Sequence, residues 1–223
     1  MNQNPEQIAR DHIDKQLLAS GWIIQDNDKN ETSLKKLESK LNEKIELSNK
    51  NIFYRSGDAN QWIIELAEAL KTKKYAALIF LDPFGMQIDW SSIEELKDTR
   101  SDVWILVPTG VIVNRLLDKA GELKYVDKLE SFLGLSEKEI KTMFYKQEVK
   151  PTLFGEEETI TKVAKPIEKI AKIYAARMKT IWKYVTEEPL RLDNRNGVPI
   201  FHFVFASNNP NALKIAKQII KNT

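Results

Sequence analysis

Hydrophobic and polar positions along the chain alternate between the period of a helix and the pattern of a buried strand. The segment YAALIFLD (75–82) is almost wholly apolar, as in a central strand covered on both faces. A short helix over SSIEELKDT (91–99), a strand over DVWILVP (102–108) and a helix beginning at Thr109 follow. Strands that alternate with helices indicate an α/β fold with a parallel sheet.

Both ends of this pattern carry further elements. On the amino-terminal side, WIIQ (22–25) and NIFYR (51–55) are short strand candidates, and the second leads through a tight turn into a helix over 59–70. On the carboxyl-terminal side, EEPLRL and PIFHFVFAS, which together cover about 187–207, predict an antiparallel hairpin. A closing helix follows, capped by Asn208 or Asn209.

The middle of the chain reads as helical. Residues from about 121 to 150 show an irregular helical pattern, and 156–182 form a long stretch with Lys and Glu on one side. The sequence therefore predicts a helical insertion over about 115–180.

Composition narrows the class of protein. The chain has 223 residues, 42% of them hydrophobic and 30% charged, which fits one globular domain or a domain with an appendage. With no Cys, disulfides, Cys-based zinc sites and thiol nucleophiles are excluded, and a cytoplasmic location is the default expectation. A net charge of +2 argues neither for nor against nucleic acid.

Other broad classes find no support in the sequence. No apolar run approaches the length of a membrane span, and the first residues lack the order of a signal peptide. The two histidines, His12 and His202, are far apart in the chain, which argues against a multi-His metal site. His202 lies in an apolar strand, so we interpret it as a core histidine.

Acidic residues follow three of the predicted strands. Glu31 comes several residues after the first strand candidate, Asp58 follows NIFYR, and Asp82 follows YAALIFL directly. Ligands of open parallel sheets bind beyond the carboxyl ends of the strands. The alternatives are structural: Asp58 is a good N-cap, and Glu31 suits the first turn of a helix.

The turn after Asp82 has the composition of a ligand-facing loop. Pro83 stiffens the exit from the strand, Phe84 offers a flat apolar face, and Gly85 allows a sharp turn of the backbone. A capped turn with no ligand is the competing interpretation. Tentative substrate contacts nearby are Gln87, Asn114 and Arg115, although a solvated surface Arg is equally compatible with the pattern.

This arrangement resembles a class I S-adenosylmethionine-dependent methyltransferase. The resemblance implies that Glu31 contacts the ribose of the cofactor and that Asp58 contacts the adenine. It places Asp82, Pro83, Phe84 and Gly85 at the reacting centre, in the position of the turn that holds the target amine. DPFG departs from the amino-methyltransferase turn at its third and fourth places, so a planar target amine does not follow.

A narrower resemblance rests on FLDPFGMQIDWSSI, VPTGVIVNRLL, PTLFG and PIFHFVFASNNPNALKIA. Together these are similar to the three-Cys-motif partner protein family, TcmP, over about residues 30–223. The resemblance implies a bacterial, methyltransferase-like partner of a three-Cys-motif protein that itself resembles radical S-adenosylmethionine enzymes, in a mobile-element or phage-defence system. The alternatives are an active methyltransferase acting on nucleic acid or protein, and a fragment that is stable only with another chain.

The chain departs from that family at its amino-terminal end. Before Gly57 the only glycine is Gly21, so we expect the first strand and the glycine loop that cradles the cofactor to be missing from a truncated domain. Residues 1–29 form an appended segment that resembles the amino terminus of the motor subunit of type I restriction enzymes, which points to a fusion or a truncation. S-adenosylmethionine is therefore the expected cofactor, with its binding weak or lost.

Overall fold

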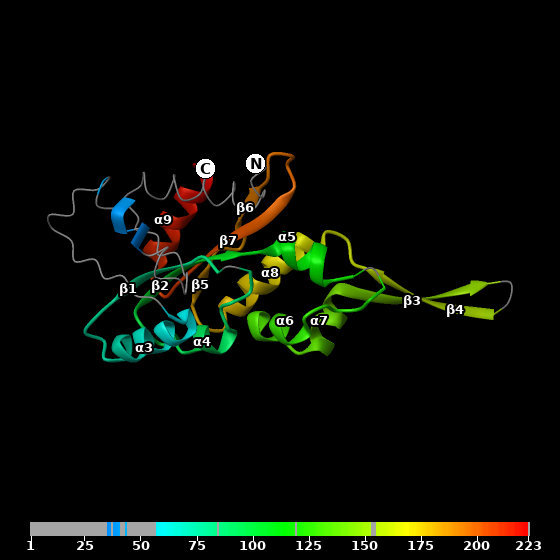
Figure 1. The fold of residues 1–223 in the computed structure, drawn as a ribbon, viewed down its shortest axis with the longest axis horizontal. Coiled ribbons are helices and arrows are strands. Elements are labelled where there is room, and N and C mark those ends of the chain that lie inside the picture. Colours follow the sequence, from blue (N-terminus) through cyan, green and yellow to red (C-terminus); the bar gives the residue numbers. More distant parts are fainter. Residues whose placement is uncertain are drawn as a thin grey trace.

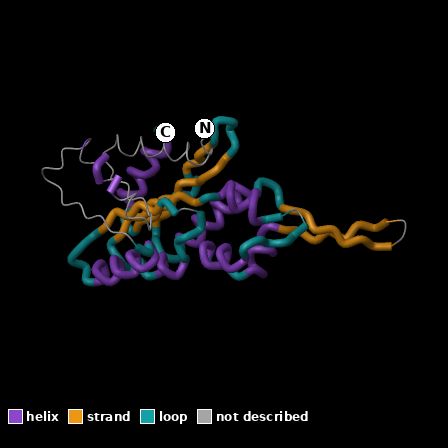
Figure 2. Tube along the Cα trace, in the orientation of Figure 1, coloured by secondary structure: helices purple, strands orange, loops and turns teal. Residues whose placement is uncertain are grey.

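The computed structural model describes residues 35, 36, 38–40, 43, 57–83, 85–118, 120–152 and 155–222. The strands predicted at 22–25 and 51–55, and the appended segment 1–29, lie outside the described residues. Figures 1 and 2 show a body of sheet and helices from which a long two-stranded ribbon projects.

Helices and strands alternate through the first half of the described chain and again at its end. In chain order the elements are α3 (Ala59–Lys71), β1 (Ala77–Leu81), α4 (Trp90–Glu94), β2 (Ser101–Val107), α5 (Thr109–Val111), the π-helix η1 (Ile112–Leu116), α6 (Val126–Leu133), α7 (Glu137–Phe144), β3 (Tyr145–Thr152), β4 (Gly155–Lys162), α8 (Pro166–Met178), β5 (Tyr184–Val185), β6 (Leu190–Asp193), β7 (Pro199–Ser207) and α9 (Pro210–Lys221). The fold is therefore α/β, as the pattern predicted.

The main sheet is mixed. β1 and β2 are parallel, whereas β7 lies beside β2 and runs antiparallel to it, from Asp102 opposite Ser207 to Val107 opposite His202. On its other side β7 pairs with β5 and β6, both antiparallel. The parallel pair and the carboxyl-terminal antiparallel hairpin were both predicted from the sequence, and both are confirmed.

The sheet has an apolar core on each face. Alternate residues of β2 divide between the two cores, with Val103 and Ile105 on one side and Trp104 and Leu106 on the other, as the two-residue period of a strand requires. The first core is covered by α3, α4, α6, α7 and α8, and the second by α9 (Figure 1). Strands buried on both faces explain why β2 and β7 read as continuous apolar runs.

Local signals set several helix starts. Ser136 accepts the backbone N–H of Glu139, and the Glu139 carboxylate accepts the N–H of Ser136, a reciprocal capping box at the start of α7. Asn209 accepts the N–H of Asn211 at the start of α9, which confirms the second of the two predicted caps. Both caps join residues that are two or three positions apart, so such caps can be predicted from the sequence.

The predicted helical insertion is wrong over its centre. Helices α6, α7 and α8 are present, but residues 145–152 and 155–162 form the antiparallel ribbon β3–β4, paired from Tyr145 opposite Lys162 to Thr152 opposite Gly155. Lys and Glu have good helix propensity, and they outweighed the β-branched residues of ETITK (158–162) in the prediction from sequence. Each strand of the ribbon is extended because it pairs with the other strand, and this pairing is not visible in the local pattern of either one.

The ribbon is held at its base. The Tyr145 hydroxyl donates to the backbone carbonyl of Asp118 over 2.9 Å, and the N–H of Val163 donates to the carbonyl of Phe144 over 2.9 Å. Burial of the ring, with the nearby Asp118 charge as a smaller cause, raises the pKa of Tyr145 to about 12. That hydroxyl therefore stays protonated, and remains a donor, throughout the physiological pH range.

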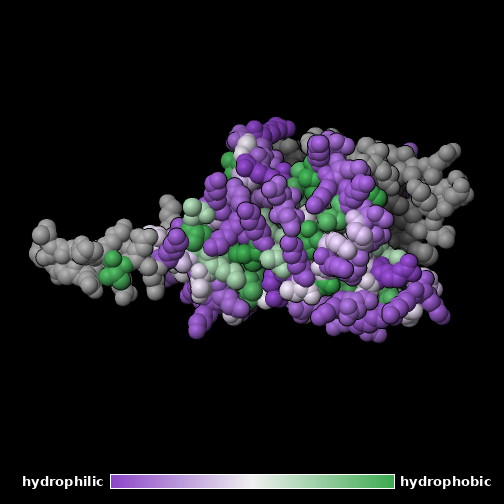
Figure 3. All heavy atoms as spheres, turned by 180° about the vertical axis from the view of Figure 1, so that it is seen from behind, coloured by the Kyte–Doolittle hydropathy of each residue, from purple (hydrophilic) through white to green (hydrophobic). Residues whose placement is uncertain are grey.

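The face of the molecule seen from behind the view of Figure 1 is mostly polar. Figure 3 shows one face on which hydrophilic side chains surround scattered apolar patches. Among the described residues, no helix combines the length and the apolar character that would let it cross a lipid bilayer.

Gly110 fixes how closely helix α5 approaches strand β7. A Cβ at this position would meet the backbone carbonyl oxygen of Pro199 at 2.5 Å and the Cα of Ile200 at 3.0 Å. Backbone atoms cannot move aside as a flexible side chain can. Only glycine allows this contact, which places η1 beside the carboxyl end of the sheet.

We expect Gly110→Ala to lower the free energy of unfolding by about 2 kcal/mol or more, because the added methyl group overlaps backbone. Gly197→Ala is the comparison variant, because nothing lies within 4 Å of the added Cβ. Only the positive φ of 72° at this position opposes the substitution, and we expect it to cost about 1 kcal/mol of stability. Urea unfolding of both variants measures the difference. Equal stability of Gly110→Ala and the parent would refute the close contact.

Candidate functional site

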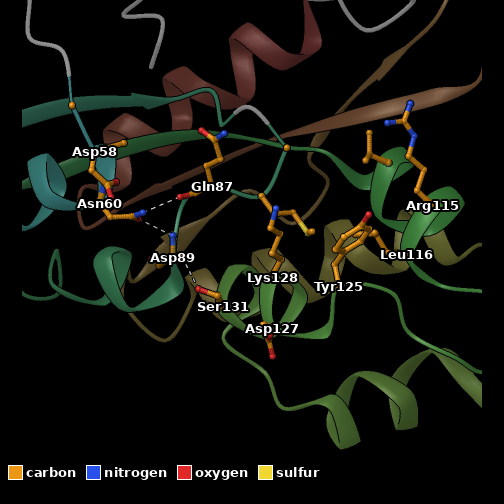
Figure 4. Close-up of a pocket in the computed structure, with 15 residues that line it drawn as sticks. Asp58, Asn60, Gln87, Asp89, Arg115, Leu116, Tyr125, Asp127, Lys128 and Ser131 are labelled. Carbon is orange, nitrogen blue, oxygen red and sulfur yellow. Dashed lines mark hydrogen bonds between the residues drawn. The ribbon is translucent and has the colours of Figure 1, made fainter. Parts of the chain in front are cut away.

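A cavity of about 730 Å³ opens near the carboxyl end of β1. Four parts of the chain form it: the start of α3, the loop after β1, the helices α5 and η1, and helix α6 with the residue before it. Its lining residues are Gly57, Asp58, Ala59, Asn60, Gly85, Met86, Gln87, Asp89, Val111, Arg115, Leu116, Tyr125, Asp127, Lys128 and Ser131. Figure 4 shows these side chains.

Four of the predicted site residues meet in this cavity. Asp58, Gly85, Gln87 and Arg115 all contribute to its lining, although they come from three separate segments of the chain. Gly85 has a φ of 71°, the left-handed conformation that the predicted sharp turn requires. These four residues therefore share one cavity, and a role for them in ligand binding stays a prediction.

The other predicted residues are placed differently. Asp82 directly follows β1 and is half-buried, and Pro83 is buried, but neither lines the cavity. Asn114 is exposed and also lies outside the lining. Glu31 and Phe84 lie outside the described residues. The cavity is thus lined by Gly85, the last residue of the DPFG turn, and by residues that follow it, whereas Asp82, the first residue of the turn, does not line it.

Asp58 caps helix α3. Its Oδ1 accepts the backbone N–H of Asn60 over 2.9 Å, and its own backbone is extended, as an N-cap requires. The predicted cap is therefore present, and the same side chain reaches the cavity. Capping and ligand contact are compatible because a carboxylate has a second oxygen.

Asn60 joins α3 to the loop after β1, a role that sequence reasoning missed. Its Nδ2 donates to the carbonyl of Gln87 over 2.9 Å, and its Oδ1 accepts the N–H of Asp89 over 2.8 Å. The Asp89 carboxylate in turn accepts the hydroxyl of Ser131 on α6 over 2.5 Å. These bonds, drawn as dashed lines in Figure 4, connect three walls of the cavity.

Charges are separated along the cavity. Figure 4 shows Asp58 and Asn60 at one end and Arg115 at the other, with Lys128 and Tyr125 between them. Met86 and Leu116 add apolar surface. An acidic end, a basic end and an apolar wall suit a ligand of mixed polarity, as in most small-molecule pockets.

Tyr125, Lys128, Asp89 and Ser131 also line the cavity without having been predicted. Tyr125, Lys128 and Ser131 belong to the segment that the sequence presented only as irregular and helical, whereas Asp89 lies in the loop after β1. Helix α6 reaches the cavity through contacts with segments that are distant in the sequence. The local sequence pattern of α6 gives no sign of these contacts. The sequence shows Tyr125 three residues before Lys128, but not that the ring is exposed or faces a cavity.

His202 is a core residue, as interpreted from the sequence. Its side chain is buried and its Nδ1 lies 2.8 Å from the hydroxyl of Thr109, which is also buried. Burial, more than the charges around it, lowers the pKa of His202. The ring is therefore neutral at pH 7 and serves packing and hydrogen bonding between α5 and β7.

Fold and cavity together define a class: an α/β protein with a mixed sheet and a ligand-sized cavity at a strand end. Comparison of the chain with known protein families, with curated proteins and with solved structures finds no match.

We expect Asn60→Ala to lower the free energy of unfolding by about 2 kcal/mol, because it removes two hydrogen bonds worth about 1 kcal/mol each. Gln61→Ala, at the exposed neighbouring position, is the matched control and leaves stability nearly unchanged. Urea unfolding gives both values. If the two variants unfold alike, Asn60 does not hold the walls of the cavity together.

Proposed function

We propose that this protein is the partner of a three-Cys-motif protein in a bacterial mobile-element or phage-defence system. It works in the cytoplasm, and its methyltransferase-like core is degenerate. The observation that carries the proposal is the composition of the strand-end cavity: Asp58 and the loop from Gly85 line it, whereas Asp82 does not.

The sheet supports a methyltransferase-like origin. β1 and β2 are parallel, and the last strand, β7, is antiparallel to β2. The resemblance set out above implies this arrangement, with DPFG at the end of a parallel strand. The cavity lies where ligands of open α/β sheets bind, beyond the carboxyl end of a strand.

The lining favours weak binding of S-adenosylmethionine. Gly57 and Gly85 are the lining glycines, and they lie on separate segments, so they do not form a run of closely spaced backbone donors. One oxygen of the Asp58 carboxylate accepts the cap hydrogen bond from Asn60, which leaves the other oxygen for a ligand. If the cofactor binds, Asp58 is the residue that would hold its adenine, and the bound cofactor would supply the transferable methyl group.

The β3–β4 ribbon supports a partner role. Val149 is 55% exposed and Ile160 is 42% exposed, and the pairing register puts both on the same face of the ribbon. A two-stranded ribbon is marginally stable in water by itself. Exposed apolar residues on a projecting ribbon are the kind of surface that a second protein covers.

An active methyltransferase acting on nucleic acid or protein is the second candidate. The observation in its favour is the size of the cavity, about 730 Å³, which falls within the range of pockets that enclose small ligands. In that case Asp82 would lie beside the reacting centre only after a rearrangement of the turn that carries it.

Titration separates the two candidates. We expect S-adenosylmethionine and S-adenosylhomocysteine to bind the full chain with dissociation constants weaker than about 100 μM in calorimetry. Micromolar affinity would overturn the degenerate core and favour the enzyme, and Asp82→Ala should then abolish turnover without unfolding the protein.

Co-purification with a three-Cys-motif protein tests the partner role. We expect the double variant Val149→Lys, Ile160→Lys to weaken capture at least about tenfold, because it introduces charge into a contact worth more than about 1.4 kcal/mol. Tyr75→Lys, which changes an exposed aromatic outside the ribbon, and Asp82→Ala are the controls and should leave capture unchanged. Equal capture of all variants would remove the ribbon from the interface.

A further inference from the structure

We propose that the strand-end cavity binds a nucleotide, with its phosphate at Arg115 and Lys128 and its base against the ring of Tyr125. The inference goes beyond the proposed function, because nucleotide binding neither requires nor excludes a partner protein. It rests on three features of the lining: a strained exposed aromatic, two cations near it, and carboxylates at the far end.

Tyr125 has a conformation that its side chain disfavours. Its φ and ψ are 53° and 51°, in the left-handed region, and its side chain is 69% exposed. Burial therefore does not account for the ring, and glycine or asparagine would suit the backbone better. A bulky aromatic kept at such a position, on the wall of a cavity, is explained if the ring itself contacts a ligand. Aromatic rings stack on any nucleic-acid base.

Two cations lie on either side of Tyr125 in the lining (Figure 4). The Lys128 ammonium is 5.8 Å from the centre of the Tyr125 ring, so one end of α6 presents both groups. Arg115 is exposed and belongs to η1, a π-helix, an irregularity that is frequent at functional sites. Among the lining residues these are the cations, and Figure 4 shows Tyr125 between them. Arg and Lys beside an aromatic ring are the elements of a phosphate-and-base site.

The carboxylates of the lining are not directed at this cationic end (Figure 4). Figure 4 shows Asp58 at the opposite end of the cavity and Asp127 directed away from the other labelled side chains. Asp89 accepts the hydroxyl of Ser131. The carboxylate end suits hydroxyl and amino donors, and the cationic end suits an anion. A nucleotide carries both and is a net anion, whereas S-adenosylmethionine has one carboxylate against a sulfonium and an ammonium, so its net positive charge opposes the two cations of the lining.

The nucleotide has two possible sources, a free mononucleotide and one unit of a single strand. The cavity volume of about 730 Å³ accommodates one nucleotide, and the exposed Tyr125 ring is accessible to either source. The chemistry recognised is the same in both cases, so the probes must separate them.

The test is calorimetry of the full chain with four probes: adenosine monophosphate, adenosine, inorganic phosphate, and a six-nucleotide single-stranded DNA. We expect the monophosphate to bind at least about tenfold more tightly than adenosine or phosphate alone, because it alone uses both halves of the site. Tighter binding of the oligonucleotide than of the monophosphate identifies a strand as the source, and the reverse order identifies the free nucleotide.

Variants of Tyr125 separate stacking from structure. We expect Tyr125→Phe to bind as the parent does. Tyr125→Gly should bind about tenfold more weakly, the fold-change for one lost stacking contact, while its melting temperature rises because the left-handed strain is relieved. Lys165→Gly is the matched control: Lys165 has a φ of 51° at the start of α8, so this variant should gain thermal stability without losing affinity.

Charge variants complete the test. We expect Lys128→Met to weaken binding of the monophosphate about tenfold and to reduce its salt dependence, whereas Lys124→Met, at an exposed position outside the lining, should do neither. The proposal is overturned if neither the monophosphate nor the oligonucleotide binds at millimolar concentration, or if Tyr125→Gly and Lys128→Met bind as the parent does. Capture by the three-Cys-motif protein is measured separately, so either proposal can fail alone.

Discussion

The antiparallel insertion of β7 is the constraint on which the described structure depends. This strand pairs with β2 on one edge and with β5 and β6 on the other, so the main sheet is continuous only through it. Its residues also divide between the two apolar cores, with Val204 and Ala206 on one face and Phe201, Phe203 and Phe205 on the other. Hydrogen bonding and apolar burial are therefore satisfied together, and neither can be lost without the other.

The same strand positions the cavity. The backbone of Pro199 and Ile200 lies against Gly110, and the neighbouring His202 ring bonds to Thr109. These contacts hold α5 and η1 at the edge of the sheet, from which Arg115 reaches the lining. The opposite wall is held by Asn60, which joins the start of α3 to the loop after β1. The cavity is thus built by backbone contacts and by hydrogen bonds of the Asn60 side-chain amide, and its charged side chains are left to face a ligand.

The two proposals use different surfaces of one chain. The partner role relies on the ribbon, whose exposed Val149 and Ile160 lie on a projection from the body. Nucleotide binding relies on the cavity, where Tyr125 and Lys128 lie at the start of α6. The ribbon, Tyr125 and Lys128 belong to the segment between η1 and α8, which the sequence presented only as an irregular helical insertion, whereas the predicted Arg115 lies in η1. Both proposals therefore assign function to the segment whose structure was hardest to predict from the sequence.

The sequence by itself determined the α/β class, the parallel pair β1–β2, the carboxyl-terminal hairpin, the Asp58 cap and the turn at Gly85. Each depends on apolar runs or on residues within a few positions of one another, where local physics acts alone. Tertiary structure decided that residues 145–162 pair as a ribbon, that Asp82 lies outside the cavity, and that Asn60, Tyr125 and Lys128 help to form it. These outcomes depend on contacts between segments far apart in the chain, and a pattern of hydrophobic and polar positions carries no record of which distant segment will be the neighbour.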